Sequence, residues 1–178
     1  MPYSVVCAIP LRFSFRPEIQ DTSPPSSWRK TPPLSANNVA LYTRKLTSPV
    51  FPVSGTLAVA AHWAAGKVAG ATGDTRALIE QLEMAVTAED AIPYMEPSYW
   101  PIPVRPALGA ALLQAGDAAK AEHVFREDLK RWPRNGWSLF GLAQSLRRQG
   151  KSESSDLVWR EFETAWKRAD VKLTLEWF

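Results

Sequence analysis

The feature that most constrains the fold is a repeat of 34 residues in the C-terminal half of the chain. Gly116 and Gly150 are 34 positions apart, and each follows apolar residues at helical spacing and precedes a polar residue. Three further pairs share this separation: Leu108 and Leu142, Leu112 and Leu146, and Phe125 and Trp159. A glycine after a periodic apolar stretch is typical of a helix that ends in a left-handed residue. The pattern therefore predicts helix-turn-helix hairpins that repeat along the chain.

A further hairpin fits the residues before this pair. The stretch "AAHWAAGKVAGATGDTRALIEQLEMAV" has apolar residues at helical spacing on both sides of a break at Gly73. These residues are Trp63, Val68, Leu78, Leu82 and Val86. Together the hairpins predict an all-α fold over residues 58–170, an α-solenoid of three antiparallel helix-turn-helix units. Residues 171–178 then form a C-terminal tail.

Residues 1–57 differ in composition from the hairpins. Nine of the fifteen prolines lie in residues 1–58, together with six Lys or Arg and only two acidic residues, Glu18 and Asp21. A Pro/Ser-rich, basic segment without a helical period predicts a largely disordered extension, apart from a short strand near Val39 to Tyr42. The same composition is compatible with a transit peptide for a plastid or mitochondrion, or with an extension that has no function.

Charge and cysteine usage limit the classes of function. The net charge of +3 comes mainly from residues 1–58, so the hairpins predict no nucleic-acid partner. The single Cys7 excludes an internal disulfide and predicts a reducing compartment, for which we expect the cytoplasm. No apolar run approaches the ~20 residues that a membrane-spanning helix needs.

The ionisable residues indicate no catalytic or metal site. The two histidines fall in different hairpins without Cys or acidic residues at ligand spacing, so we expect no metal and no other cofactor. Neighbouring helix residues point about 100° apart, so neither Glu89-Asp90 nor Glu127-Asp128 converges on one substrate. We expect both pairs to lie on solvated helix faces, and we expect that the chain is not an enzyme.

The 34-residue hairpins resemble the tetratricopeptide repeat family, in particular a bacterial-type subgroup with a Pro- and aromatic-rich insert. The second hairpin carries the resemblance most fully: Leu108-Gly109 on its first helix, Gly116 at the turn, Ala121 and Phe125 on its second helix, and Pro133 at its end. The third departs at Ala143 and Ser155, and the first at Leu78, where a small residue is usual. The resemblance covers residues 59–169 and implies that Phe125 fills the space beneath closely packed helices.

Members of this family usually bind a protein or peptide segment on the concave surface that their first helices line. The groove-facing positions of the family fall on nine residues of this chain: Trp63, Lys67, Leu113, Gln114, Trp137, Phe140, Gln144, Arg147 and Arg148. Aromatic rings beside Arg favour an acidic or aromatic partner segment. The resemblance thus implies an adaptor, scaffold or assembly factor. For Trp137 and Phe140 we give equal weight to a second position, in the core or under the tail "LTLEWF", instead of the groove.

An insert separates the first two hairpins. Gly73 and Gly116 are 43 residues apart rather than 34, and the extra residues lie within "AIPYMEPSYWPIPVRP". Its prolines predict an extended strap. Five of its residues form an alternative binding site: Tyr94, Glu96, Tyr99, Trp100 and Arg105. We favour a structural role instead, in which Glu96 pairs with Arg105 and the strap lies across the hairpins.

A function of another class remains open beside peptide binding. Three hairpins are near the minimum that a repeat array needs, so the chain can be a fragment or structural module of a longer array, without binding activity of its own. Exposed apolar surface on the first hairpin would favour this alternative. Self-association through the first or the last hairpin is compatible with either function.

Overall fold

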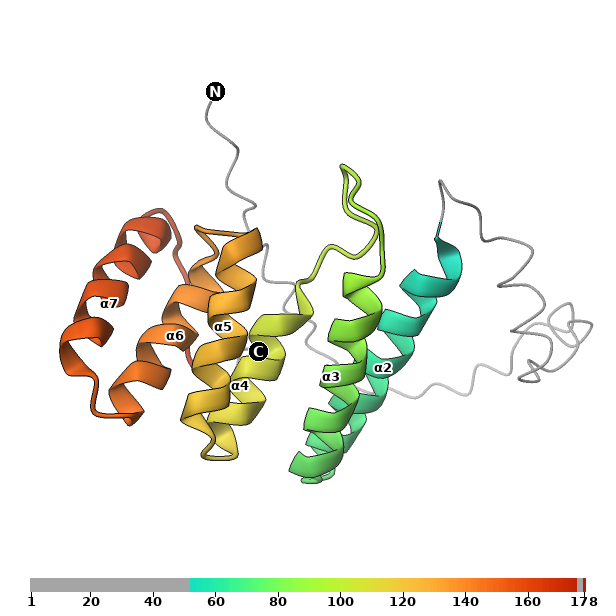
Figure 1. The fold of residues 1–178 in the computed structure, drawn as a ribbon, viewed down its shortest axis with the longest axis horizontal. Helices are drawn as coiled ribbons and strands as arrows, with labels where there is room; N and C mark the ends of the chain where they lie inside the picture. Colours follow the sequence, from blue (N-terminus) through green and yellow to red (C-terminus); the bar gives the residue numbers. More distant parts are fainter. Residues whose placement is uncertain (1–51, 176–177) are drawn as a thin grey trace, which may run out of the picture. The chain divides into compact units, whose positions relative to one another are not determined.

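The computed structural model describes residues 52–175 and 178, and the regular structure in these residues is entirely helical (Figure 1). Six helices follow one another: α2 Val53–Ala71, α3 Thr75–Asp90, α4 Val104–Gln114, α5 Ala118–Arg131, α6 Gly136–Arg148 and α7 Ser152–Trp166. Short turns join α2 to α3, α4 to α5 and α6 to α7, and the helices of each pair pack against each other. The all-α prediction is confirmed.

The predicted N-terminal extension lies mostly outside the described residues, as does the strand expected near Val39 to Tyr42. Residues 53–57, which the composition assigns to the extension, form the first turn of α2 instead. The helix begins directly after Pro52. A proline is tolerated at this end because the first N–H groups of a helix have no intrahelical acceptor, so its missing N–H removes no helical hydrogen bond. None of the described helices combines the length and the apolar character needed to cross a bilayer.

Three glycines end the first helix of each hairpin, as the sequence predicts. Gly73, Gly116 and Gly150 have φ angles of 81°, 90° and 75°, in the left-handed region that favours glycine. At each turn the N–H of the next residue donates to the carbonyl five positions earlier: Asp74 to Ala69, Asp117 to Leu112 and Lys151 to Leu146. This bond is part of the Schellman motif, so the three reversals of the chain share one geometry.

The inner helices α4 and α6 are the most buried. Nine of the 11 residues of α4 and nine of the 13 residues of α6 are buried. Both helices contact the helices before and after them in the chain, and they also contact each other. By contrast, only Val59 and Gly66 are buried among the 19 residues of α2. Most of the core therefore lies around α4 and α6.

Phe125 of α5 is fully buried between these two helices. A Cβ atom added at Gly109 of α4 would lie 2.5 Å from the ring, and one added at Gly141 of α6 would come closer still. Both helix backbones approach the ring this closely because neither glycine carries a side chain. The expected contact of Phe125 beneath Gly109 is confirmed, whereas the repeat pattern does not single out Gly141.

Asp128 joins α5 to the start of α6. Its side chain is 2% exposed and accepts hydrogen bonds from Ser138 Oγ at 2.5 Å and Asn135 Nδ2 at 2.8 Å. Burial raises the pKa of Asp128, although these hydrogen bonds act in the opposite direction. The expectation that Glu127 and Asp128 both lie on a solvated face is therefore wrong for Asp128, because its carboxyl is buried and joins α5 to the start of α6.

A group of charges lies where α3 meets α4. Glu89 accepts a hydrogen bond from the N–H of Val104 at 3.3 Å, and burial raises the pKa of Glu89 to about 7. Asp90 forms ion pairs with Arg105 of α4 and Arg131 of α5. The expectation that Glu89 and Asp90 both lie on a solvated face is wrong for Glu89, because its carboxyl accepts a hydrogen bond from the first turn of α4.

Candidate functional site

The C-terminal tail turns back from α7 and crosses the hairpins. Trp166 Nε1 donates a hydrogen bond to the carbonyl of Val171 at 2.7 Å, which places the start of the tail against α7. Leu173 is 5% exposed and packs with Leu139 of α6 and Phe162 of α7. The next residues reach α4 and α2, and Figure 1 marks the C-terminus beside α4.

Polar side chains from two hairpins hold the end of the tail through its backbone. Gln114 Nε2 of α4 donates to the carbonyl of Leu175 at 3.2 Å, and Lys67 Nζ of α2 donates to a backbone oxygen of Phe178 at 2.6 Å. Burial lowers the pKa of Lys67. Because both acceptors are backbone oxygens, these bonds do not depend on which side chains the bound segment carries.

The ring of Phe178 makes aromatic contacts with α5 and α6. Its centroid lies 5.1 Å from that of Trp137 in an edge-to-face pair, 6.4 Å from Phe140 in a stacked pair and 6.5 Å from Phe125. These are the separations at which aromatic rings attract one another. Lys67, Gln114, Trp137 and Phe140 are the side chains that hold the end of the tail, and we call them the tail site.

Five of the nine predicted groove residues belong to the tail site or to its immediate surroundings. Four of them define the tail site, and the fifth is Trp63 of α2. Lys67 Nζ lies over the Trp63 ring, 4.8 Å from the ring centroid. Trp137 is half-buried, between Phe178 and Trp166. Phe140 is 7% exposed and contributes to the core while its ring faces the tail. Phe140 thus belongs to the core and to the tail site at once.

The other predicted groove residues make contacts within the fold. Leu113 is fully buried, and its carbonyl accepts a hydrogen bond from Arg148 Nη1, which joins α6 to α4. The guanidinium of Arg147 lies 5.9 Å from the ring centroid of Trp159, so this side chain faces α7 rather than the tail. Gln144 is half-buried on α6.

The strap between α3 and α4 spans residues 91–103 and is anchored by Trp100. The Trp100 ring packs edge-to-face on Trp63, with centroids 6.3 Å apart, and belongs to the edge of the main core. Its Nε1 atom is buried and has no hydrogen-bond partner among the described residues. Tyr99 lines a surface hollow of about 230 Å³ with the first turn of α2. The contacts of Trp100 favour the structural role of the strap.

The polar residues of the strap pair differently from the expectation. Arg105 binds Asp90 of α3, whereas Glu96 accepts a hydrogen bond from the hydroxyl of Tyr94 at 2.7 Å. The predicted pairing of Glu96 with Arg105 is therefore wrong. Arg105 lies in the first turn of α4, because that helix begins at Val104 and takes in the last three residues of the predicted strap. A proline in this first turn removes no intrahelical hydrogen bond.

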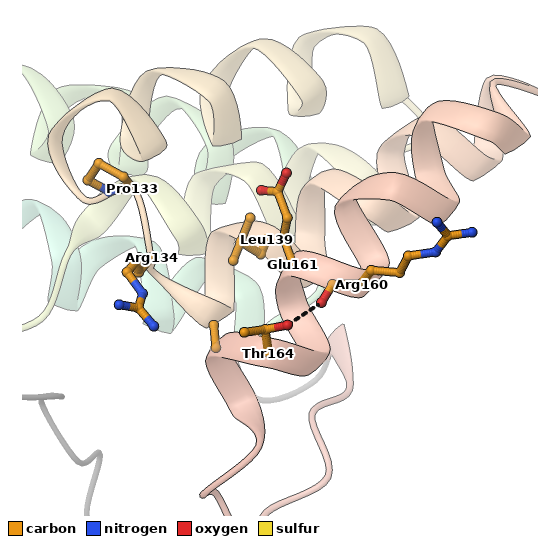
Figure 2. A pocket seen from close by; sticks show the side chains of 7 residues that line it. Pro133, Arg134, Leu139, Arg160, Glu161 and Thr164 are labelled. Carbon is orange, nitrogen blue, oxygen red and sulfur yellow. Dashed lines mark hydrogen bonds between the residues drawn. The ribbon is translucent and has the colours of Figure 1, made fainter.

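A surface hollow of about 380 Å³ lies between the α5–α6 connection, α6 and α7 (Figure 2). The residues that line it are Pro133, Arg134, Leu139, Arg160, Glu161, Thr164 and Ala165. In Figure 2 the charged ends of Arg134, Arg160 and Glu161 point in different directions. The hollow therefore lacks the converging polar groups of a small-molecule site. No three His, Cys, Asp or Glu side chains come together as a metal site in the part of the chain that the structure describes.

The repeat pattern assigns no binding residues to the tail itself. Apolar residues alternate at Val171, Leu173 and Leu175, with polar residues between them. A period of two is typical of an extended segment with one buried face, and this pattern is the signal that points to the tail.

No family model matches the chain, and neither a curated protein nor a solved structure matches it. A function is therefore inferred from the residues of the tail site.

Proposed function

We propose that the chain is a non-enzymatic interaction module whose tail site binds an extended segment of a partner protein. The observation that carries this proposal is that side chains of the site already bind backbone oxygens of the chain's own tail, at Leu175 and Phe178. Gln114 of α4 and Lys67 of α2 donate to these two oxygens from different hairpins. Backbone hydrogen bonds combined with a pocket for one large side chain are a recurring way to recognise extended peptides.

Three tetratricopeptide-like hairpins provide the framework of this proposal. The left-handed glycine turns recur in every hairpin, and each helix packs on the next one in the chain. In an α-solenoid of this kind the first helices of the hairpins, here α2, α4 and α6, line one concave groove. The tail site draws Lys67 from α2, Gln114 from α4 and Trp137 with Phe140 from α6. This distribution supports a groove that an extended segment crosses from hairpin to hairpin.

Site-specific photocross-linking in the full chain tests the proposal. Gln114 is replaced by the photoreactive residue benzoylphenylalanine, and a second chain carries the same residue in place of Lys120. Lys120 is a matched control because its side chain is 71% exposed and lies on α5, outside the tail site. We expect partner segments to cross-link through position 114 and not through position 120 in an extract of the source cells. Identical cross-linked proteins at both positions, or none at position 114, would contradict the proposal.

A second candidate function is a structural module that stacks on further repeats. The observation in its favour is exposed apolar surface on the first hairpin: Leu57, Val68 and Met84 are 47%, 65% and 41% exposed. Val68 is one of the apolar residues at helical spacing in that hairpin, yet its side chain is exposed. A photoreactive residue at position 68 distinguishes the candidates, because stacking predicts cross-links from α2 to another helical repeat and peptide binding in the tail site does not.

A further inference from the structure

We propose that the contact between α3 and α4 is a pH-sensitive joint between the first two hairpins. The carboxyl proton of Glu89 keeps the end of α3 docked on the first turn of α4, and release of this proton to water loosens the docking. The joint is independent of peptide binding in the tail site, and it is a regulatory device within the fold itself.

The first hairpin is attached to the rest of the fold mainly through α3. This helix packs on α4, whereas the main neighbour of α2 is α3. In addition, α2 reaches Trp100 of the strap through Trp63 and Phe178 of the tail through Lys67. A change at the contact between α3 and α4 therefore acts on the attachment of the whole hairpin.

The N-terminus of α4 is capped by a side chain of α3. The residue before α4 is Pro103, whose side chain offers no acceptor. The N–H of Val104 donates instead to Glu89 Oε2, at 3.3 Å. Three other helices are capped by the residue directly before them: α3 by Asp74, α5 by Asp117 and α6 by Asn135. Unlike these helices, α4 depends for its cap on the end of another helix.

Three carboxyl groups and two guanidinium groups meet at this contact. Asp90 of α3 forms ion pairs with Arg105 of α4 at 2.5 Å and with Arg131 of α5 at 2.8 Å. Glu89 of α3 and Asp128 of α5 complete the group, and both act electrostatically on Arg105. Two positive charges balance two carboxylates. A proton on the third carboxyl therefore makes the group neutral, and its loss leaves an excess negative charge.

The charges that act on Glu89 are those of Arg105, Asp128 and Asp90. The other titratable residues of the neighbouring elements have contacts elsewhere: His62 with Gln81, Lys67 with Phe178, Tyr94 with Glu96, Tyr99 with the first turn of α2, and Glu127 with Lys130. The balance of the group therefore depends on its own five members.

Hydrogen bonding places the proton on Glu89 rather than on Asp128. Asp128 Oδ2 accepts two hydrogen bonds, from Ser138 and Asn135, and these stabilise its carboxylate form. Glu89 accepts the longer bond from Val104 alone among the described residues. Burial raises the pKa of both carboxyls, and that of Glu89 reaches about 7 although the Val104 bond and Arg105 act in the opposite direction.

The sign of the pH effect follows from the docked and undocked states. In the docked state Glu89 keeps its proton up to a pH of about 7, whereas a solvated Glu89 loses it near its ordinary pKa of 4.5. Between these values docking takes up a proton, so docking is strongest at acidic pH and weakens as the pH rises. Above a pH of about 7 the carboxyl is ionised in both states, and the pH has no further effect through this group.

Hydrogen exchange of the Val104 amide in the full chain tests the joint, because this N–H exchanges when its bond to Glu89 opens. The measured quantity is the protection factor, which is the intrinsic exchange rate divided by the observed rate. We expect it to fall about tenfold for each pH unit between about 5 and 6.5, and to level off above the pKa of Glu89. Nuclear magnetic resonance of the ¹⁵N-labelled chain provides the rates.

Two variants assign the pH dependence to one carboxyl. Glu89→Gln is neutral and keeps an oxygen acceptor for Val104, so the protection factor should not change with pH. Glu83→Gln is the matched control, since Glu83 is an exposed residue of the same helix, and it should behave as the parent does. A parent protection factor that is constant with pH would overturn the proposal, and so would a pH dependence that survives in Glu89→Gln.

Two further readouts come from the parent chain alone. Val104 should be less protected than Leu142, which is buried in α6, because the joint opens without unfolding of the chain. Equal protection of the two amides would overturn a local joint. The ¹³C shift of the Glu89 carboxyl carbon should titrate with a midpoint of about 7. A midpoint at the ordinary value of 4.5 would overturn the proposal even if the Glu89→Gln chain does not fold.

Discussion

The first hairpin and the central helices have similar apolar sequences but bury them to very different extents. Only two of the 19 residues of α2 are buried, against nine of the 11 residues of α4. The main neighbour of α2 is α3, whereas α4 packs on α3, α5 and α6. Burial in these hairpins is therefore set by the number of neighbouring helices more than by the apolar content of the helix itself.

The glycines of the two regions differ in the same way. A Cβ atom at Gly66 of α2 would make ordinary contacts of 3.4 to 3.6 Å with Gln81, Leu82 and Leu78. A Cβ atom at Gly109 or Gly141 would instead collide with the ring of Phe125. Small residues are thus a packing requirement around α4 and α6, and they are not one at Gly66.

The largest predicted effect is in the central helices. Phe125→Ala should lower the free energy of unfolding by about 3–5 kcal/mol, because it leaves a cavity between α4 and α6 that their backbones cannot fill. Leu57→Ala in α2 should cost less than about 1 kcal/mol, since Leu57 is 47% exposed. Urea unfolding followed by circular dichroism measures both. Similar losses for the two variants would contradict the difference in packing between α2 and the central helices.

The next prediction concerns the glycines and has opposite signs in the two regions. Gly141→Ala should destabilise the chain by about 1–3 kcal/mol through overpacking against Phe125. Gly66→Ala should stabilise it by up to about 1 kcal/mol, because alanine has the higher helix propensity and the new methyl group has room. Thermal unfolding of both variants checks the signs, and a destabilised Gly66→Ala chain would show that α2 is as tightly packed as α6.

A pH prediction concerns the joint between the two regions. Burial raises the pKa of Glu89 from its ordinary value of 4.5 to about 7. Between these values the folded chain binds a proton that the unfolded chain does not, so the stability contributed by this carboxyl falls as the pH rises from 4.5 to 7. Glu89→Gln should therefore gain stability relative to the parent as the pH is raised through this window. Urea unfolding of both chains at several pH values measures the difference, and a difference independent of pH would contradict a buried Glu89.

The smallest expected effect is at the exposed face of the first hairpin. Val68→Ser should change the free energy of unfolding by no more than about 0.5 kcal/mol, because Val68 is 65% exposed. Chemical unfolding and sedimentation are measured on the same sample. A clear loss of stability together with loss of self-association would show that this face is covered by another repeat.

The sequence predicts the elements of this fold that depend on local chemistry. The left-handed glycines at the three turns follow from their position after periodic apolar residues, and Gly73, Gly116 and Gly150 all adopt that conformation. The place of Phe125 beneath Gly109 follows from the spacing of the second hairpin. Both features are set by residues that are close together in the chain.

Features that depend on distant segments were not predictable in this way. Gly141 of the third hairpin faces Phe125 of the second hairpin, and no local sequence pattern connects these two residues. The buried position of Asp128 depends on the start of α6, which supplies its hydrogen-bond donors. The exposure of Val68 depends on which helices lie next to α2. For the candidate site, the repeat register identified Lys67, Gln114, Trp137 and Phe140, but it gave no indication that the end of the tail lies on them.

The most direct test of the account is a nuclear Overhauser measurement on the full chain, with selectively labelled Trp and Phe. We expect cross-relaxation between the rings of Trp137 and Phe178, whose centroids are 5.1 Å apart. Absence of the signal would show that Phe178 does not lie on the tail site, and it would contradict the geometry from which the proposed function is argued.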